Sequence, residues 1–191
     1  MSEENNYFGF DEEVNSESSQ SKFMPAGIET GRFIEKLEFI NGPNGDYFEV
    51  GMIDNAGRTV TGRYYEPRLD GGYIKTDGDL KKKRGQISKV LANLSRKFLG
   101  ENYIMEQKES FAAFCEAILE SIGDKYKGVE LRTKVILNSK NFPTLPSYAP
   151  IWEDPKNIPD SETKLVINSI DKVTASAAEA DRDTTRTAWT A

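Results

Sequence analysis

One stretch of the chain, residues 58–97, is rich in basic side chains with tyrosines placed among them. It carries 11 Lys/Arg and 4 acidic residues, inside a chain whose net charge is −6. Tyr64, Tyr65 and Tyr73 lie within the same stretch. Phosphates attract cations and unpaired bases stack on flat rings, so this composition is typical of a surface that holds a single nucleic-acid strand.

Residues 81–84 (KKKR) form the densest basic run of this stretch. We expect Asp79 to cap a helix there, which places the run in the first helical turn, where cations oppose the helix macrodipole. The arrangement becomes favourable when an anion such as phosphate binds the free N–H groups. A solvated charge run without a ligand is the alternative interpretation.

Residues 58–66 are expected to form a strand, and a strand directs successive side chains to opposite faces. Tyr64 and Tyr65 therefore point in opposite directions. Because Tyr65 shares its face with Arg63, we expect Tyr65 to stack on a base and Tyr64 to enter the core. The alternative, equally good, is that one tyrosine lies in the core and the other on the surface, and that neither binds a ligand.

A second candidate surface is the loop at residues 140–148 (KNFPTLPSY), where prolines stiffen the backbone. A stiff loop that carries rings such as Phe142 and Tyr148 loses little entropy when a strand binds to it. The alternative is a surface loop that packs its own aromatic side chains.

These residues need a scaffold, and the pattern predicts one that is mainly β. Strands are expected at 31–40, 46–53 and 58–66, joined by turns at 41–45 and 54–57, as an antiparallel meander. Two amphipathic helices follow, one from Asp79 to a cap at Gly100 and one from Ser110 to Ile122.

After Gly128 the chain alternates again and predicts a strand at 129–137. Leu131, Thr133 and Val135 share one face, and Arg132 and Lys134 the other. Residues 142–152 contain three prolines, which exclude a central sheet position and favour an edge strand or a wrapped extension.

Charge and composition divide the chain into three parts. Residues 1–22 sum to −5, 23–150 to +2 and 151–191 to −3. An apolar share of 37% and a mean hydropathy of −0.60 fit one core with polar extensions. We therefore expect a disordered acidic tail at 1–22, in which residues 7–10 (YFGF) are a flexible segment or a docking motif. A domain follows at 23–153, and a polar, largely flexible tail at 154–191.

The composition argues against several classes of protein. With one cysteine and no histidine, the chain has no internal disulfide and lacks the commonest general base and metal ligand. No long apolar run or signal peptide is visible, so we expect a cytoplasmic protein. We expect no enzyme activity and neither a cofactor nor a metal. A nuclease built on Asp46, Glu49 and Glu130 with Lys134 is the enzymatic alternative, although their spacing matches no motif.

The order of strands and helices is that of an OB-fold, a five-stranded Greek-key barrel that binds oligonucleotides on strands 2 and 3 and the adjoining loops. The fold class we expect is mainly β with inserted helices (α+β). It is an OB-like antiparallel barrel with two helices between strands 3 and 4. The loops at 41–46 and 138–141 would then flank the binding face.

Residues 23–153 also resemble the small single-stranded DNA-binding proteins of tailed bacteriophages. The resemblance is carried by FMPAGIE, RYYEP, DLKKKRGQISKVLANL and KVILNSKNFPTLPSYAPIWE, in this order. It implies sequence-tolerant binding of exposed strands during phage DNA replication and recombination, in the host cytoplasm. It also implies that the acidic C-terminal tail recruits other replication or recombination proteins.

Together these patterns predict a groove between strand 3 and the start of the first helix. Arg96 and Lys97 are left out, because cations suit the C-terminal end of a helix. A phage assembly or scaffold protein that uses the barrel to bind proteins is the alternative, and the choice between DNA and RNA stays open. The candidate nucleic-acid-binding residues are Arg58, Arg63, Tyr65, Tyr73, Lys75, Lys81, Lys82, Lys83, Arg84, Lys140, Phe142 and Tyr148.

Overall fold

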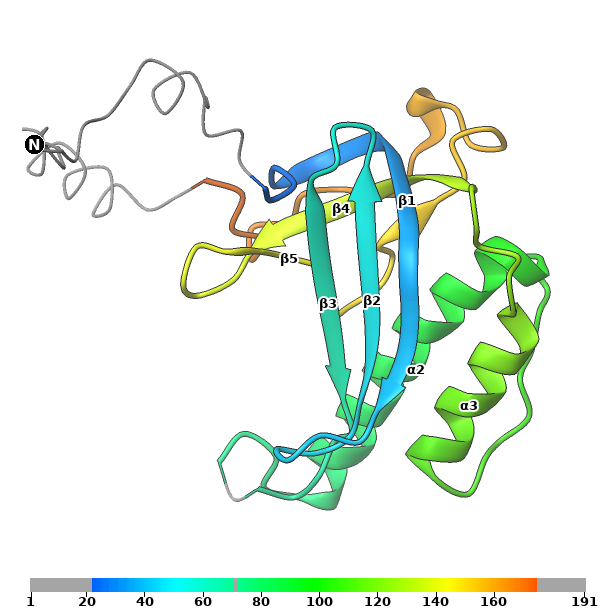
Figure 1. Cartoon of the computed structure of the whole chain (residues 1–191). Coiled ribbons are helices and arrows are strands. Elements are labelled where there is room, and N and C mark those ends of the chain that lie inside the picture. Colours follow the sequence, from blue (N-terminus) through cyan, green and yellow to red (C-terminus); the bar gives the residue numbers. More distant parts are fainter. Residues whose placement is uncertain (1–21, 71, 175–191) are drawn as a thin grey trace, which may run out of the picture.

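The computed structural model describes residues 22–70 and 72–174 (Figure 1). Its elements in chain order are β1 (Gly27–Ile40), β2 (Tyr47–Asp54), β3 (Thr59–Tyr65), α2 (Asp77–Leu99), α3 (Phe111–Ile122), β4 (Glu130–Leu137), β5 (Pro143–Thr144), β6 (Trp152–Glu153) and the short 3₁₀ helix η1 (Asp160–Glu162). The predicted N-terminal tail up to residue 21, with its aromatic cluster at 7–10, lies outside the described residues. So do residues 175–191 of the predicted C-terminal tail.

The strands form a nearly closed antiparallel barrel. Their order is β3-β2-β1-β4-β5, and β6 also pairs with β4. β5 lies beside β3, where the Thr144 hydroxyl donates to the Thr61 carbonyl at 3.2 Å. Figure 1 shows β1, β2 and β3 as one curved layer, with β4 and β5 crossing behind it. The prediction of a mainly β fold is confirmed, and the barrel is consistent with the OB-like fold.

The closure of the barrel explains why position 62 of β3 is a glycine. A Cβ at Gly62 would lie 2.8 Å from the Cβ of buried Leu145, which follows β5. Val60 and Tyr64, on the same face of β3, are buried, and the Tyr64 hydroxyl donates to the Pro146 carbonyl at 3.2 Å. Tyr64 is therefore a core residue, as predicted.

Helix α2 begins earlier than predicted. Thr76 is the N-cap, and its hydroxyl accepts from the backbone of Asp79, whose carboxylate accepts from the backbone N–H of Thr76. Asp79 is thus the third residue of a capping box, not the cap, and its carboxylate suits the positive end of the macrodipole. The basic run at 81–84 lies beyond the first turn, so the predicted conflict with the macrodipole does not exist.

The other helix signals are confirmed. Gly100 caps α2, and Arg96 and Lys97 lie in its last turn. Ser110 caps α3, on which Cys115 is buried. No helix in the described part of the chain is long and apolar enough to cross a membrane.

The segment at 142–152 wraps into the molecule as an extension with two very short strands. The Trp152 ring is fully buried, and its Nε1 lies 3.2 Å from the Met52 sulfur. The side-chain oxygen of Asn93, on α2, accepts from the backbone N–H of Ile151 at 3.0 Å. These contacts join the end of the barrel to α2.

The polar face of β4 is buried, which alternation alone does not predict. Lys134 is only 1% exposed, and its Nζ donates to Asp171 at 3.3 Å, to the Tyr148 hydroxyl and to the Val166 carbonyl. Arg132 forms ion pairs with Glu153 and Asp160. Residues 153–174 thus lie along β4, past the boundary that composition suggested at residue 153.

We expect the Asp171→Ala substitution to destabilise the fold by about 3 kcal/mol, because it leaves the buried Lys134 ammonium without its carboxylate. Burial opposes ionisation of Asp171, but hydrogen bonds from Tyr148, Asn168 and Lys134 lower its pKa. The stabilisation is therefore present above the ordinary pKa of an aspartate, about 3.9, and is lost as the pH falls through the lower folded-state pKa. Urea unfolding at pH 7 and at decreasing pH checks both expectations.

Asp124→Ala is the matched control for this prediction. Its ion pair with Lys127 is exposed, so its loss should change the free energy of unfolding by less than about 0.5 kcal/mol. Equal losses for Asp171→Ala and Asp124→Ala at pH 7 would contradict a stabilising role of the buried pair.

Candidate nucleic-acid interface

The outer face of the barrel at β3 presents alternating polar and aromatic side chains. Thr59, Thr61, Arg63 and Tyr65 are exposed, while the residues between them are buried. In the β2–β3 register Glu49 lies opposite Arg63, and Tyr47 lies opposite Tyr65. Directly paired residues share a face of the sheet, so β2 contributes to the same surface.

Two tyrosine rings, half-buried Tyr47 and exposed Tyr65, form a platform at the end of β3. The centroids of Tyr65 and Tyr47 are 4.9 Å apart, with an angle of 41° between the rings. Tyr65 remains 44% exposed. The pair leaves an aromatic surface open to solvent, on which a planar base can stack.

Arg63 is held beside this platform by a carboxylate and a ring. Its Nε donates to Glu49 at 2.7 Å, and its guanidinium lies 5.5 Å from the centroid of Tyr47. Within the described residues its two terminal nitrogens make no hydrogen bond. The side chain is thus fixed while its outer donors remain available to a phosphate.

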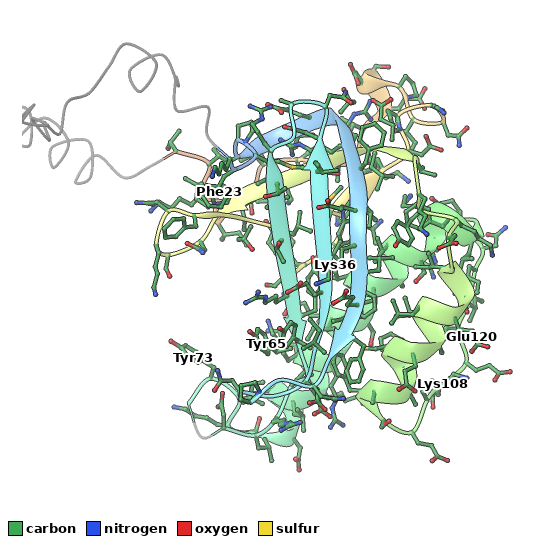
Figure 2. The ribbon with its side chains drawn as sticks, viewed as in Figure 1. Phe23, Lys36, Tyr65, Tyr73, Lys108 and Glu120 are labelled. Carbon is green, nitrogen blue, oxygen red and sulfur yellow. The ribbon has the colours of Figure 1, made fainter. Side chains whose placement is uncertain are left out.

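Glu49 is the nearly buried acid of this face. Its carboxylate also accepts from Lys36 Nζ at 3.2 Å, and Lys36 extends from β1 on the same face (Figure 2). Burial raises the pKa of Glu49, but the hydrogen bonds from Arg63 and Lys36 outweigh it and lower the pKa. Glu49 is therefore ionised at neutral pH and offsets part of the positive charge.

A second aromatic pair lies at the other end of β3. Phe23 forms a parallel bridge with Thr59, in which the Met24 N–H donates to the Thr59 carbonyl at 3.0 Å. The Phe142 ring, from the loop after β4, lies edge-on to Phe23 with centroids 6.2 Å apart. The two rings are 50% and 53% exposed. Lys140, in the same loop as Phe142, is also exposed.

Tyr73 and Lys75 lie on the loop between β3 and α2. The Asp70 carboxylate closes this loop by accepting from the backbone N–H groups of Gly72 and Ile74, which lower its pKa. Tyr73 projects from the loop and is 97% exposed. Figure 2 shows Tyr73 and Tyr65 on the same side of the barrel.

The basic run of α2 does not join this surface as one unit. Successive helical residues point about 100° apart, so Lys81, Lys82, Lys83 and Arg84 surround the helix axis. A pocket of about 510 Å³ lies between α2, the residues that follow β3 and residues 105–114, and its charged lining residues are Arg84, Glu66, Glu106, Lys108 and Glu109. The first three residues of the run do not line it. The pocket is therefore not the basic groove that the sequence predicted.

Two further candidates have structural partners elsewhere. Arg58 donates from Nε to Asp54 at 2.7 Å, within the turn between β2 and β3. The Tyr148 ring lies 4.4 Å from Lys134 Nζ, and its hydroxyl donates to Asp171. Tyr148 thus helps to hold the C-terminal segment against β4.

Sequence reasoning assigned no binding role to Tyr47, Lys36 and Phe23. The alternation of residues 46–53 already placed Tyr47 opposite the core face, and the tight turn at 54–57 would have paired it with Tyr65. For Phe23 the only signal was its place at the start of FMPAGIE. Its bridge to Thr59 joins residues distant in sequence.

The four residues of the alternative nuclease site have separate partners. Glu130 accepts from the Gly31 N–H at 2.9 Å, and Lys134 is buried against Asp171. Glu49 is paired with Arg63, and Asp46 lies 3.8 Å from Arg68. Within residues 22–70 and 72–174, no group of three or more possible ligand residues is placed to hold a metal ion.

Comparisons of the chain with protein-family models, with curated proteins and with solved structures find no match.

Proposed function

We propose that the chain is a sequence-tolerant single-stranded DNA-binding protein without catalytic activity. The observation that carries this proposal is the ring pair of exposed Tyr65 and half-buried Tyr47 beside the fixed guanidinium of Arg63, on the outer face of an OB-like barrel. This face of the OB-fold is the one that binds oligonucleotides. Rings and a guanidinium in contact supply both the stacking and the phosphate contact that a single strand requires.

The resemblance to phage single-stranded DNA-binding proteins supports a role in phage DNA replication and recombination, in the host cytoplasm. On this proposal the protein protects exposed strands. Its acidic C-terminal tail recruits replication or recombination proteins.

Stacking should contribute more to affinity than charge. The ion pairs of Glu49 and Glu38 offset the charges of Arg63 and Lys36 on the sheet. Lys75 and Lys140 are exposed and have no ion pair within the described residues. The surface therefore combines rings with a few cations.

We expect Tyr65→Ala to weaken the binding of oligo-dT about 5- to 100-fold, because a base loses its stacking partner. Tyr65→Phe keeps the ring and should bind within about twofold of the wild type. Fluorescence anisotropy with labelled oligo-dT measures both. Equal affinities of the wild type and Tyr65→Ala, with unchanged thermal unfolding, would remove the observation on which the proposal stands.

The affinity for single-stranded DNA should depend only weakly on salt concentration. If about three phosphates are neutralised, the slope of log affinity against log salt should be near −2, from about −0.7 per phosphate of a single strand. Titrations between low and physiological salt measure this slope. A slope steeper than about −4 would mean that charge dominates and that the basic run of α2 takes part.

The second candidate is an assembly or scaffold protein, favoured by the open edge of β3. The backbone groups of Thr59 point away from β2 to residues 22–24, so those of Arg63 and Tyr65 point the same way. Within the described residues, no strand pairs with this part of the edge. A partner protein can add a strand there.

Size-exclusion chromatography with and without oligonucleotide separates the two candidates. A DNA-binding protein should elute earlier only when oligo-dT is present. A shift with a protein partner but not with oligo-dT would favour the scaffold.

A further inference from the structure

We infer that a single strand runs along β3 and contacts two aromatic stations, one at each end of this strand. This inference rests on the proposed function and specifies the path of the ligand. The first station is the ring pair of Tyr65 and Tyr47. The second station is the ring pair of Phe23 and Phe142.

The two stations lie on one face of the sheet. Tyr65 shares the outer face of β3 with Thr59, since their positions differ by six and side chains at even spacings along a strand point to the same face. Phe23 is the direct bridge partner of Thr59, and paired residues point to the same face. Figure 2 shows Phe23 and Tyr65 toward opposite ends of β3. One ligand can therefore reach both stations without passing around the barrel.

The register fixes the spacing of the stations. Tyr65 and Thr59 are six residues apart along β3. At about 3.3 Å per residue this places the stations about 20 Å apart. Stacked nucleotides follow one another at about 3.4 Å, so about six of them span this distance, and fewer suffice when the strand is extended.

Between the two stations, the outer face of β3 is polar and offers few bulky side chains. Thr61 and Arg63 are the outward residues of β3 there, and the β2 residue opposite Thr61 is Gly51, which has no side chain. Arg63 lies next to the first station. Lys22 and Lys140, both exposed, are close in sequence to the two rings of the second station. Cations thus flank both ends of the path.

The test uses three oligonucleotides of eight nucleotides with the same backbone charge. The two-ended oligonucleotide has thymines at positions 1, 2, 7 and 8 and abasic sites between them. Each of the two one-ended oligonucleotides has thymines at one end only. Because all three carry the same phosphates, the ratio of two-ended to one-ended affinity reports whether one strand engages two separate stations.

For the full-length wild type we expect the two-ended oligonucleotide to bind at least about 10-fold tighter than either one-ended oligonucleotide. Tyr65→Ala or Phe142→Ala removes one of the two rings of a station and leaves the other station whole, so the ratio should fall toward two, the statistical advantage of two ends. Ile104→Ala removes an exposed apolar side chain that lies between α2 and α3, and should keep the wild-type ratio.

The outcomes separate this inference from the proposed function. A wild-type ratio near two, with measurable binding of the one-ended oligonucleotides, would overturn the path along β3 and leave single-strand binding intact. No binding of these oligonucleotides or of long oligo-dT would overturn both. Thermal unfolding of each variant identifies any loss of affinity that comes from a loss of structure.

Discussion

The bend of β1 is the constraint on which the rest of the structure depends. This strand of 14 residues pairs with β4 along its first part and with β2 along its second part, and the pairing shifts register near residues 29–32 and 34–36. Irregularities of this kind bend a strand and increase its twist, which closing a barrel requires. Buried Arg32 lies at the crossing and donates to the Thr133 carbonyl at 2.8 Å. β1 thus joins β2 and, through it, β3 to β4 in one sheet.

Local sequence patterns were sufficient to predict much of the fold. Strong alternation and tight turns predicted β2 and β3, and therefore the opposite directions of Tyr64 and Tyr65. Other features depend on residues far apart in sequence. The partners of buried Lys134 lie 14 to 37 residues away along the chain, and those of Arg132 lie 21 to 28 residues away. Most of them belong to a segment whose polar composition suggested no packing. Phe23 likewise joins the outer face of β3 through its pairing with Thr59, which is distant in sequence.

The candidate site shows why charge counted along the chain is a weak guide to a binding surface. Residues 81–84 are adjacent in sequence but surround a helix axis, whereas Arg63 and Lys36 come from different strands and meet at Glu49. A sheet gathers side chains from neighbouring strands on one face, and a helix distributes consecutive residues around itself. The surface that emerges is aromatic first and basic second.

The burial of Cys115 has a consequence for chemical labelling. Burial within α3 raises the pKa of this thiol to about 12, so almost none of it is thiolate at neutral pH. The thiolate is the reactive form, and Cys115 is the only cysteine of the chain. The native protein should thus be inert to maleimides. A cysteine introduced on the outer face of β3 would take up a fluorophore or spin label at that one position.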